Sequence, residues 1–227
     1  MFFFFNNSPY IAIIGDVKKS RNINDRSAFQ EKLKQTLIKV NQLYSDSIAS
    51  NFTITLGDEF QGLLHSGKYI MDIIHYIKKE VYPNKIRFGI GIGNITTEIN
   101  FEMSIGADGP GYYKARESVE NLKLLEKKKE SAFGDIVISI DGDNFLQELS
   151  LNSIFKLMYS IENSWTKKQR EVINYVLFNK MNQTKTAEYF NVTQSNIQQI
   201  LSKGHFYAYK DAFDTVNKIL SEIEYDK

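Results

Sequence analysis

The sequence predicts an α/β (α+β) fold, a mixed sheet with helices, followed by a small all-α helix-turn-helix domain. Short β-branched segments alternate with segments of helical spacing up to residue 140, and only helical spacing follows. Residues 183–200 have the pattern of a helix-turn-helix. The 227 residues exceed one average domain and fit two compact ones, which we predict at residues 1–150 and 151–227.

The first part begins with an apolar, β-branched run at residues 10–15, which is typical of a buried strand. Apolar residues then recur at helical spacing from residue 26 to about 44 and predict an amphipathic helix. Residues 52–56 alternate apolar residues with threonines, as in a half-buried strand, and a Gly-Asp turn leads into a second apolar run at 60–64. We expect these two runs to form a hairpin.

Helical spacing returns over residues 68–80, and Pro83 ends that element. Residues 86–92 alternate again and predict another strand. The first part is completed by a helix at about 112–128, a strand at 136–140 and a helix at 144–160. This order implies one mixed sheet covered by helices, largely on one face.

The composition is that of a packed globular protein, with 42% hydrophobic and 24% charged residues. Cysteine is absent, which excludes disulfides, thiolate zinc sites and cysteine nucleophiles and suits a reducing cytoplasm. The aromatic run Phe2–Phe5 lacks the basic segment of a targeting signal, so we interpret it as a partly buried arm or an edge strand. No stretch approaches the roughly 20 apolar residues that span a bilayer, so we expect a cytoplasmic protein with no membrane partner.

Carboxylates at strand ends are the clearest chemical signal in the first part. Asp16 follows the first strand, and Asp58 and Glu59 lie at the tip of the hairpin. If the first strand lies beside the hairpin, these oxygens meet at one edge of the sheet and suit Mg²⁺ or Mn²⁺, which in turn hold a nucleoside triphosphate or another nucleotide. The alternative is turn chemistry, because Asp after Gly commonly hydrogen-bonds its own backbone.

Four segments, taken in order, resemble class III nucleotide cyclases. Thr53-Ile-Thr-Leu-Gly-Asp-Glu-Phe60 looks like their metal-binding hairpin and like the GGDEF hairpin of diguanylate cyclases, and Asp16 matches their first metal aspartate. Arg87-Phe-Gly-Ile-Gly-Ile-Gly93 is similar to the strand after the next helix, and Gly111-Tyr-Tyr-Lys-Ala-Arg116 to the later helix. The resemblance implies a nucleotide-cyclase-like (ferredoxin-like or palm) sheet with metal at Asp16, Asp58 and Glu59.

Three further segments are similar to the SatD-like family, whose activity is poorly defined. They are Ile14-Gly-Asp-Val-Lys-Lys-Ser-Arg21, Leu56-Gly-Asp-Glu-Phe-Gln-Gly62 and Ser104-Ile-Gly-Ala-Asp-Gly-Pro110. The chain departs from active cyclases at Ile54, where they have a base-selecting lysine, at Tyr112, where they have asparagine, and at Leu56, where the GGDEF pattern has glycine. These differences favour a sensing domain over an enzyme, and we assign no catalytic residue.

Several residues are candidates for contacts with nucleotide phosphates. Lys18, Lys19 and Arg21 follow Asp16 and could contact phosphates, or they form a solvated loop. The cyclase resemblance adds Gly57 in the hairpin and Arg116, which matches a phosphate-contacting arginine.

The helix-turn-helix pattern occupies residues 183–200. Ala187 is small where two helices would cross, and Asn191 occupies the turn position that requires a left-handed backbone. Thr193 is a good N-cap, and Val192, Ile197 and Ile200 supply apolar contacts behind the second helix. A preceding helix at 165–178 completes a three-helix unit that resembles region four of sigma factors.

By this resemblance, the helix that starts near Thr193 would enter the major groove of double-stranded DNA. The polar residues of this helix suit base edges, and the candidates are Thr193, Gln194, Ser195, Asn196, Gln198 and Gln199. Cations would contact the phosphate backbone of the DNA, and the candidates are Lys185, Lys203 and also Arg170. Seven basic against three acidic residues in 165–213 favour this weakly, while the whole chain carries a net charge of +1. A helix-turn-helix that contacts only protein is the alternative.

The sequence therefore predicts a DNA-binding transcription regulator with a degenerate cyclase-like domain that senses a nucleotide or a metal. One alternative is an active Mg²⁺- or Mn²⁺-dependent nucleotidyl cyclase or transferase, and another is a protein-interaction module without a ligand. A homodimer would raise the weak affinity expected of one copy. The amphipathic tail at 206–223 could dimerise or dock on its own chain.

Overall fold

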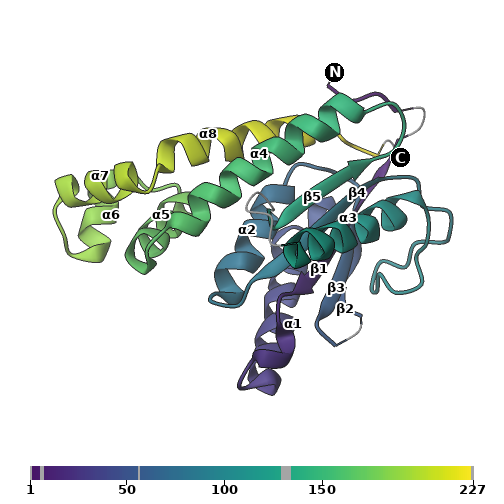
Figure 1. Cartoon of the computed structure of the whole chain (residues 1–227), viewed down its shortest axis with the longest axis horizontal. Helices are drawn as coiled ribbons and strands as arrows, with labels where there is room; N and C mark the ends of the chain where they lie inside the picture. The colour runs from purple at the N-terminus through teal and green to yellow at the C-terminus, as the bar shows by residue number, and fades with distance from the viewer. Residues whose placement is uncertain (1, 6–7, 56, 129–133, 226–227) are drawn as a thin grey trace.

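The computed structural model describes residues 2–5, 8–55, 57–128 and 134–225. Leu56, which belongs to the predicted hairpin, lies outside the described residues. Within the described chain, a mixed sheet is covered by helices, and a pair of long helices leads from it to three short helices (Figure 1). No helix in these ranges is long and apolar enough to cross a bilayer.

The sheet has five strands in the order β2-β3-β1-β4-β5, and all neighbours are antiparallel except β4 and β5. The strands are β1 (Tyr10–Val17), β2 (Ile48–Ile54), β3 (Glu59–Leu64), β4 (Ile86–Gly93) and β5 (Ile136–Ile140). The predicted mixed sheet and the hairpin β2–β3 are confirmed. Strand β1 is longer than predicted, because it continues through Asp16 to Val17 and carries the carboxylate inside the ladder.

The helices alternate with the strands and then follow one another to the end of the described chain. They are α1 (Arg26–Leu43), α2 (Ile70–Val81), α3 (Pro110–Lys127), α4 (Phe145–Ser164), α5 (Lys167–Asn179), α6 (Gln183–Phe190), α7 (Gln194–Lys203) and α8 (Phe206–Leu220), with short 3₁₀ helices η1 (Ser20–Asn22) and η2 (Ser45–Ser47). The helical stretches that the hydrophobic spacing predicts are all present, with ends shifted by a few residues.

The two faces of the sheet are covered unequally. Ile11 and Ile13 of β1 belong to a large core with α1, α2, α4 and α8, whereas Ala12 and Ile14 point to the other face and pack with α3. Helix α3 lies against β4 because the strand has glycines there: a Cβ atom on Gly91 would lie 2.0 Å from a carbonyl oxygen of α3. Helices therefore lie largely on one face, as predicted, and α3 covers the other.

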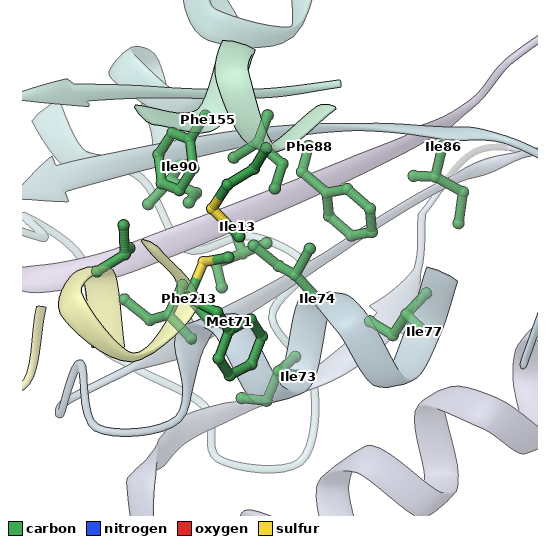
Figure 2. Close-up of a cluster of buried hydrophobic side chains, with 14 of the residues drawn as sticks. Ile13, Met71, Ile73, Ile74, Ile77, Ile86, Phe88, Ile90, Phe155 and Phe213 are labelled. Carbon is green, nitrogen blue, oxygen red and sulfur yellow. The ribbon is translucent and has the colours of Figure 1, made fainter. Parts of the chain in front are cut away.

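The large core is built around α2. Figure 2 shows Ile73, Ile74 and Ile77 along α2, with Phe155 of α4 and Phe213 of α8 in the same cluster. Helix α2 is strongly amphipathic, so burying one side of it against the sheet removes most of its apolar surface from water. Side chains from both ends of the sequence thus share one continuous core.

The predicted boundary at residue 150 falls inside α4, which runs without a break from β5 to the start of α5. Helix α8 returns beside α4 toward the sheet (Figure 1). The backbone N–H of Gly67 donates to Ile223 (2.8 Å), and that of Tyr225 donates to His65 (2.7 Å). Of the two alternatives for the tail, docking on its own chain is therefore the one observed.

The aromatic run near the N-terminus forms a partly buried arm and not a strand. Phe3 is 2% exposed and joins the large core. The N–H of Phe2 donates to the carboxylate of Glu222 (2.6 Å), and that of Phe4 donates to the Oδ1 of Asn144 (2.8 Å). The arm thus connects the end of α8 to the start of α4.

Candidate functional site

The strand register places three charged residues in one row across the sheet. Asp16 of β1 lies opposite Glu59 of β3 on one side and opposite Arg87 of β4 on the other. Because Asp16 is two residues after Ile14, it points to the face that α3 covers. The expected convergence of Asp16 and Glu59 at one end of the sheet follows from this register.

Cations from β4 and α3 pair with these carboxylates. Asp16 contacts the guanidinium of Arg87 at 2.5 Å and the ammonium of Lys123 at 3.1 Å. Glu59 receives hydrogen bonds from Arg116 at 2.9 and 3.4 Å. We call this row and its partners the charged cluster: Lys18, Asp16, Glu59, Arg87, Arg116, Lys123 and Glu126.

Glu126 of α3 closes the charged cluster from the helix side. It pairs with Arg87 and, at 2.5 Å, with Lys18. Burial alone would raise the pKa of Glu126, but the hydrogen bonds and charges of Lys18 and Arg87 lower it below its ordinary value. For Lys18 burial outweighs the carboxylate, and the pKa is lowered. The cluster is therefore a set of partly buried, mutually paired charges.

This arrangement bears on the predicted metal. The described residues contain no group of three or more His, Cys, Asp or Glu placed to hold a metal ion. Asp58 is half-buried in the turn after Gly57, whose φ of 65° is left-handed, and its carbonyl accepts from the N–H of Val17 (3.2 Å). A divalent ion at Asp16 and Glu59 would have to displace Arg87, Lys123 or Arg116. As they stand, these carboxylates do not fit a resident metal ion.

The three cations after β1 are separated by the structure. Lys18 and Lys19 line a cavity of about 580 Å³ together with Lys85 and Tyr159. Arg21 is exposed in η1 and does not line this cavity. The loop turns there because Lys19 has a left-handed backbone with φ 52°. Two of the predicted phosphate contacts therefore border a hollow that a small anion could enter.

Local sequence signals explain the geometry of α6 and α7. Asn191 ends α6 in a left-handed conformation, φ 50° and ψ 52°, which asparagine tolerates better than most residues. The hydroxyl of Thr193 accepts a hydrogen bond from the N–H of Asn196 (3.2 Å) and caps α7. Ala187 is 6% exposed, and Ile197 is fully buried behind α7. These are the features that the helix-turn-helix pattern predicts.

The outer face of α7 is polar and exposed. All the residues predicted to read bases are exposed, and so are the two lysines predicted to hold phosphates: Thr193, Gln194, Ser195, Asn196, Gln198, Gln199, Lys185 and Lys203. Arg170 is different, because its guanidinium donates to the carboxylate of Glu162 (2.8 Å) and lies over the ring of Trp165. These contacts give Arg170 a structural role, and its contact with a DNA backbone stays a prediction.

A buried ion cluster joins α2, α4, α5 and the start of β5, and the sequence reasoning missed it. The ammonium of Lys78 contacts Glu162 at 2.5 Å and Asp135 at 2.7 Å. Burial alone lowers the pKa of Lys78, but the charges of Asp135 and Glu162 outweigh it and raise that pKa. Burial alone would raise the pKa of Glu162, but the charges of Lys78, His75 and Arg170 outweigh it and lower that pKa. The signal in the sequence that could have indicated this cluster is Lys78, a lysine on the inward side of an amphipathic helix.

His75 of α2 lies beside this buried ion cluster. It is 4% exposed, and its ring stacks on Phe178 with centroids 5.2 Å apart. Burial lowers the pKa of His75 to about 4, so the ring is neutral at physiological pH. His75 therefore serves as an uncharged packing residue between α2 and α5.

Comparison with known proteins gives one family. The model of the SatD family matches residues 10–217. No curated protein matches the chain. A solved structure with low similarity is a regulator of polyketide synthase expression from Bifidobacterium adolescentis, with 9% sequence identity, a TM-score of 0.27, and coverage of 94% of this chain and 86% of that chain.

Proposed function

The chain belongs to the SatD family, and from that premise we propose that it is a DNA-binding transcription regulator whose cyclase-like sheet senses a nucleotide. The observation that carries the proposal is the exposed polar face of α7 behind a capped, left-handed turn. Gln and Asn side chains can pair with adenine in the major groove, and Asn196 and Gln198 are placed to do so if α7 enters it.

The charge distribution supports the same proposal. Lys185 at the start of α6 and Lys203 at the end of α7 are both exposed and flank the polar face. Lysines at the edges of a recognition helix suit phosphate contacts that fix its register, whereas the amides between them suit base edges. With so few cations, one copy would bind weakly, and its affinity would depend on salt.

The experiment is fluorescence anisotropy of the full chain on mixed duplex DNA across salt concentrations. Binding that weakens linearly in log salt supports the proposal, and selection of a preferred sequence is then the next step. No binding at low salt would overturn it and would leave α7 as a surface for protein contacts. Lys203→Gln, at the end of α7, and Lys218→Gln, on the exposed side of α8, serve as test and matched control.

A nucleotide is the ligand we propose for the charged cluster, and its phosphates are the recognised group. Arg116 is the most accessible cation there, with a side chain 54% exposed, and Lys18 and Lys19 border the adjoining cavity. A phosphate could take over the place of the Glu59 carboxylate on Arg116 because both are oxyanions. Calorimetry with ATP and GTP, with and without Mg²⁺, tests this, and Arg116→Gln should abolish the heat of binding.

A homodimer is part of the proposal. Apolar residues line the outer side of α4 in exposed positions: Leu146 is 70% exposed, Leu149 53% and Leu157 67%. Their spacing places them on one stripe of the helix, and a second copy could bury the same stripe in an isologous contact. Sedimentation of the wild type against Leu149→Lys with Leu157→Lys tests it, since a dimer should become a monomer.

The second candidate function is a metal-dependent nucleotidyl cyclase or transferase. It would require Arg87, Lys123 and Arg116 to release the carboxylates with which they pair, and the observation that favours it is the register that brings Asp16 and Glu59 together. Incubation with labelled ATP or GTP and Mn²⁺ tests it, with Asp16→Ala and Asp58→Ala as variants. Product that disappears in both variants would establish an enzyme, and no product would leave the sensing role.

A further inference from the structure

A second pocket lies where α2 meets the helix-turn-helix unit. Its volume is about 630 Å³, within the range of small-molecule sites. One stripe of α5 forms part of its lining, the end of α2 contributes Lys79 and Tyr82, and the end of α6 contributes Tyr189 and Phe190. The charged cluster lies on the α3 side of the sheet and shares no residue with this pocket.

The lining combines aromatic rings with cations. Tyr175 of α5 and Tyr189 of α6 stack with centroids 4.1 Å apart, and Tyr189 is 65% exposed. Tyr82, at the end of α2, also lines the pocket and is 43% exposed, and the guanidinium of Arg170 lies over its ring, 5.0 Å from the centroid. The exposed ring of Tyr189 is therefore suited to stacking on the flat ring of a ligand.

The charges around the rings are mostly positive. Lys79, Lys167 and Arg170 line the pocket, against the single carboxylate of Glu171. The hydrogen bonds of Arg170 to Glu162 use its terminal nitrogens, and its buried Nε has no hydrogen-bond partner among the described residues. Lys167 is the first residue of α5, where the helix dipole also favours an anion.

We propose that this pocket binds a small ligand that combines a flat aromatic ring with a carboxylate or phosphate. The ring would lie against Tyr189, and the anionic group near Lys79 and Lys167. Tyr189 is two residues from the Asn191 turn into α7, so an occupant would contact the helix that sets the orientation of α7. The regulatory part of this inference rests on the proposed DNA binding; the binding of the ligand does not.

The test is titration of the full chain, without DNA, with salicylate and with AMP, followed by saturation-transfer NMR and calorimetry. Phenol and adenosine serve as uncharged counterparts of the two probes. We expect at least one charged probe to bind about tenfold more tightly than its counterpart, and the two probes separate a carboxylate ligand from a phosphate one. Failure of both charged probes to bind at millimolar concentration would overturn the proposal.

Variants assign the binding to this pocket. Tyr189→Ala and Lys167→Gln should each weaken the bound probe by about tenfold, because each removes one wall or one charge. Tyr113→Ala removes an equally exposed tyrosine on α3, 59% exposed, and should change nothing. Equal losses in Tyr113→Ala and Tyr189→Ala would contradict the assignment.

The two proposals fail separately. A probe that binds to a chain with no affinity for duplex DNA would sustain the pocket and overturn the DNA-binding function. DNA binding by a chain that binds neither probe would sustain the DNA-binding function and overturn the pocket. If both hold, the probe should shift the DNA dissociation constant by at least about threefold, and Tyr189→Ala should remove that shift.

Discussion

Asp16 and Arg87 lie opposite each other on β1 and β4, and their side chains form an ion pair of 2.5 Å. Both side chains are mostly buried, with 14% and 11% of their surface exposed. The carboxylate that the sequence suggests as a metal ligand is therefore already neutralised by a neighbouring strand. The pair ties the end of β1 to β4 and, through Glu126, to α3.

Asp16→Asn should destabilise the protein by about 1–3 kcal/mol, because it removes the charge that partly buried Arg87 faces. Urea unfolding followed by circular dichroism measures this. Asp143→Asn, at an exposed position after β5, is the matched control and should stay within about 0.5 kcal/mol of the wild type. A stable Asp16→Asn variant would show that Glu126 alone satisfies Arg87.

Asn191→Ala should cost about 1–2 kcal/mol, because alanine is strained at a φ of 50°. Asn191→Gly should be close to neutral, since glycine adopts this conformation freely. Thermal unfolding of the two variants side by side measures the difference. Equal losses in both would mean that the asparagine side chain, and not the backbone conformation, stabilises the turn.

Glu162→Gln should cost about 3 kcal/mol or more, because Lys78 and Arg170 are then left with less negative charge in a buried place. Glu117→Gln, on the exposed side of α3, is the control. Chemical denaturation compares the two. A small effect would mean that Asp135 compensates for the lost carboxylate.

The pH dependence of stability should follow His75. Its pKa falls from 6.5 when unfolded to about 4 when folded, so the unfolded state binds more protons between these values. Above pH 6.5 His75 is neutral in both states and does not reduce the free energy of unfolding. As the pH falls from 6.5 toward 4, protonation of His75 in the unfolded state lowers that free energy by about 3 kcal/mol in total. Urea midpoints from pH 7 down to about 5 should drop in the wild type.

His75→Phe should flatten this profile, because phenylalanine does not titrate. His205→Asn, at an exposed left-handed position that asparagine tolerates, should keep the wild-type slope. If His75→Phe folds poorly, His75→Gln provides the same comparison. An unchanged slope in a folded His75 variant would assign the pH dependence to other groups that titrate between pH 7 and 5, and Glu162 is not one of them because its pKa is lowered to about 2.

Salt dependence separates the two kinds of predicted DNA contact. Lys185→Gln and Lys203→Gln should each lower the slope of log affinity against log salt by about 1, on any sequence. Asn196→Ala should leave the slope unchanged and cost about 1–3 kcal/mol on the preferred sequence alone. Anisotropy titrations measure both. A Lys203→Gln variant with the wild-type slope would remove that lysine from the interface.

The elements of the fold could be predicted because their signals are local. Alternation over Ile86–Gly93 puts the large apolar side chains of the strand on one face and its glycines on the other, and helical spacing over Ile70–Val81 marks the buried side of that helix. The cap at Thr193 and the left-handed turn at Asn191 could be predicted for the same reason, since both depend on neighbours in sequence.

The partners of the site residues could not be predicted, because they come from distant parts of the chain. Asp16 meets Arg87 only through the register of β1 with β4, and Glu59 meets Arg116 only because α3 crosses that face. The burial of Lys78 likewise depends on α4, which brings Glu162 to it. Local patterns report which face is buried, not which charges share it.

The antiparallel pair of α4 and α8 works as a lever. Helix α4 has 20 residues and is about 30 Å long, and α5, α6 and α7 lie at the end farthest from β5 (Figure 1). A tilt of about 5° about Leu151, which belongs to the large core, would move Ser164, about 20 Å further along the helix, by roughly 2 Å. Repacking the sheet end of α4 can therefore re-aim α7 without altering any residue on its exposed face.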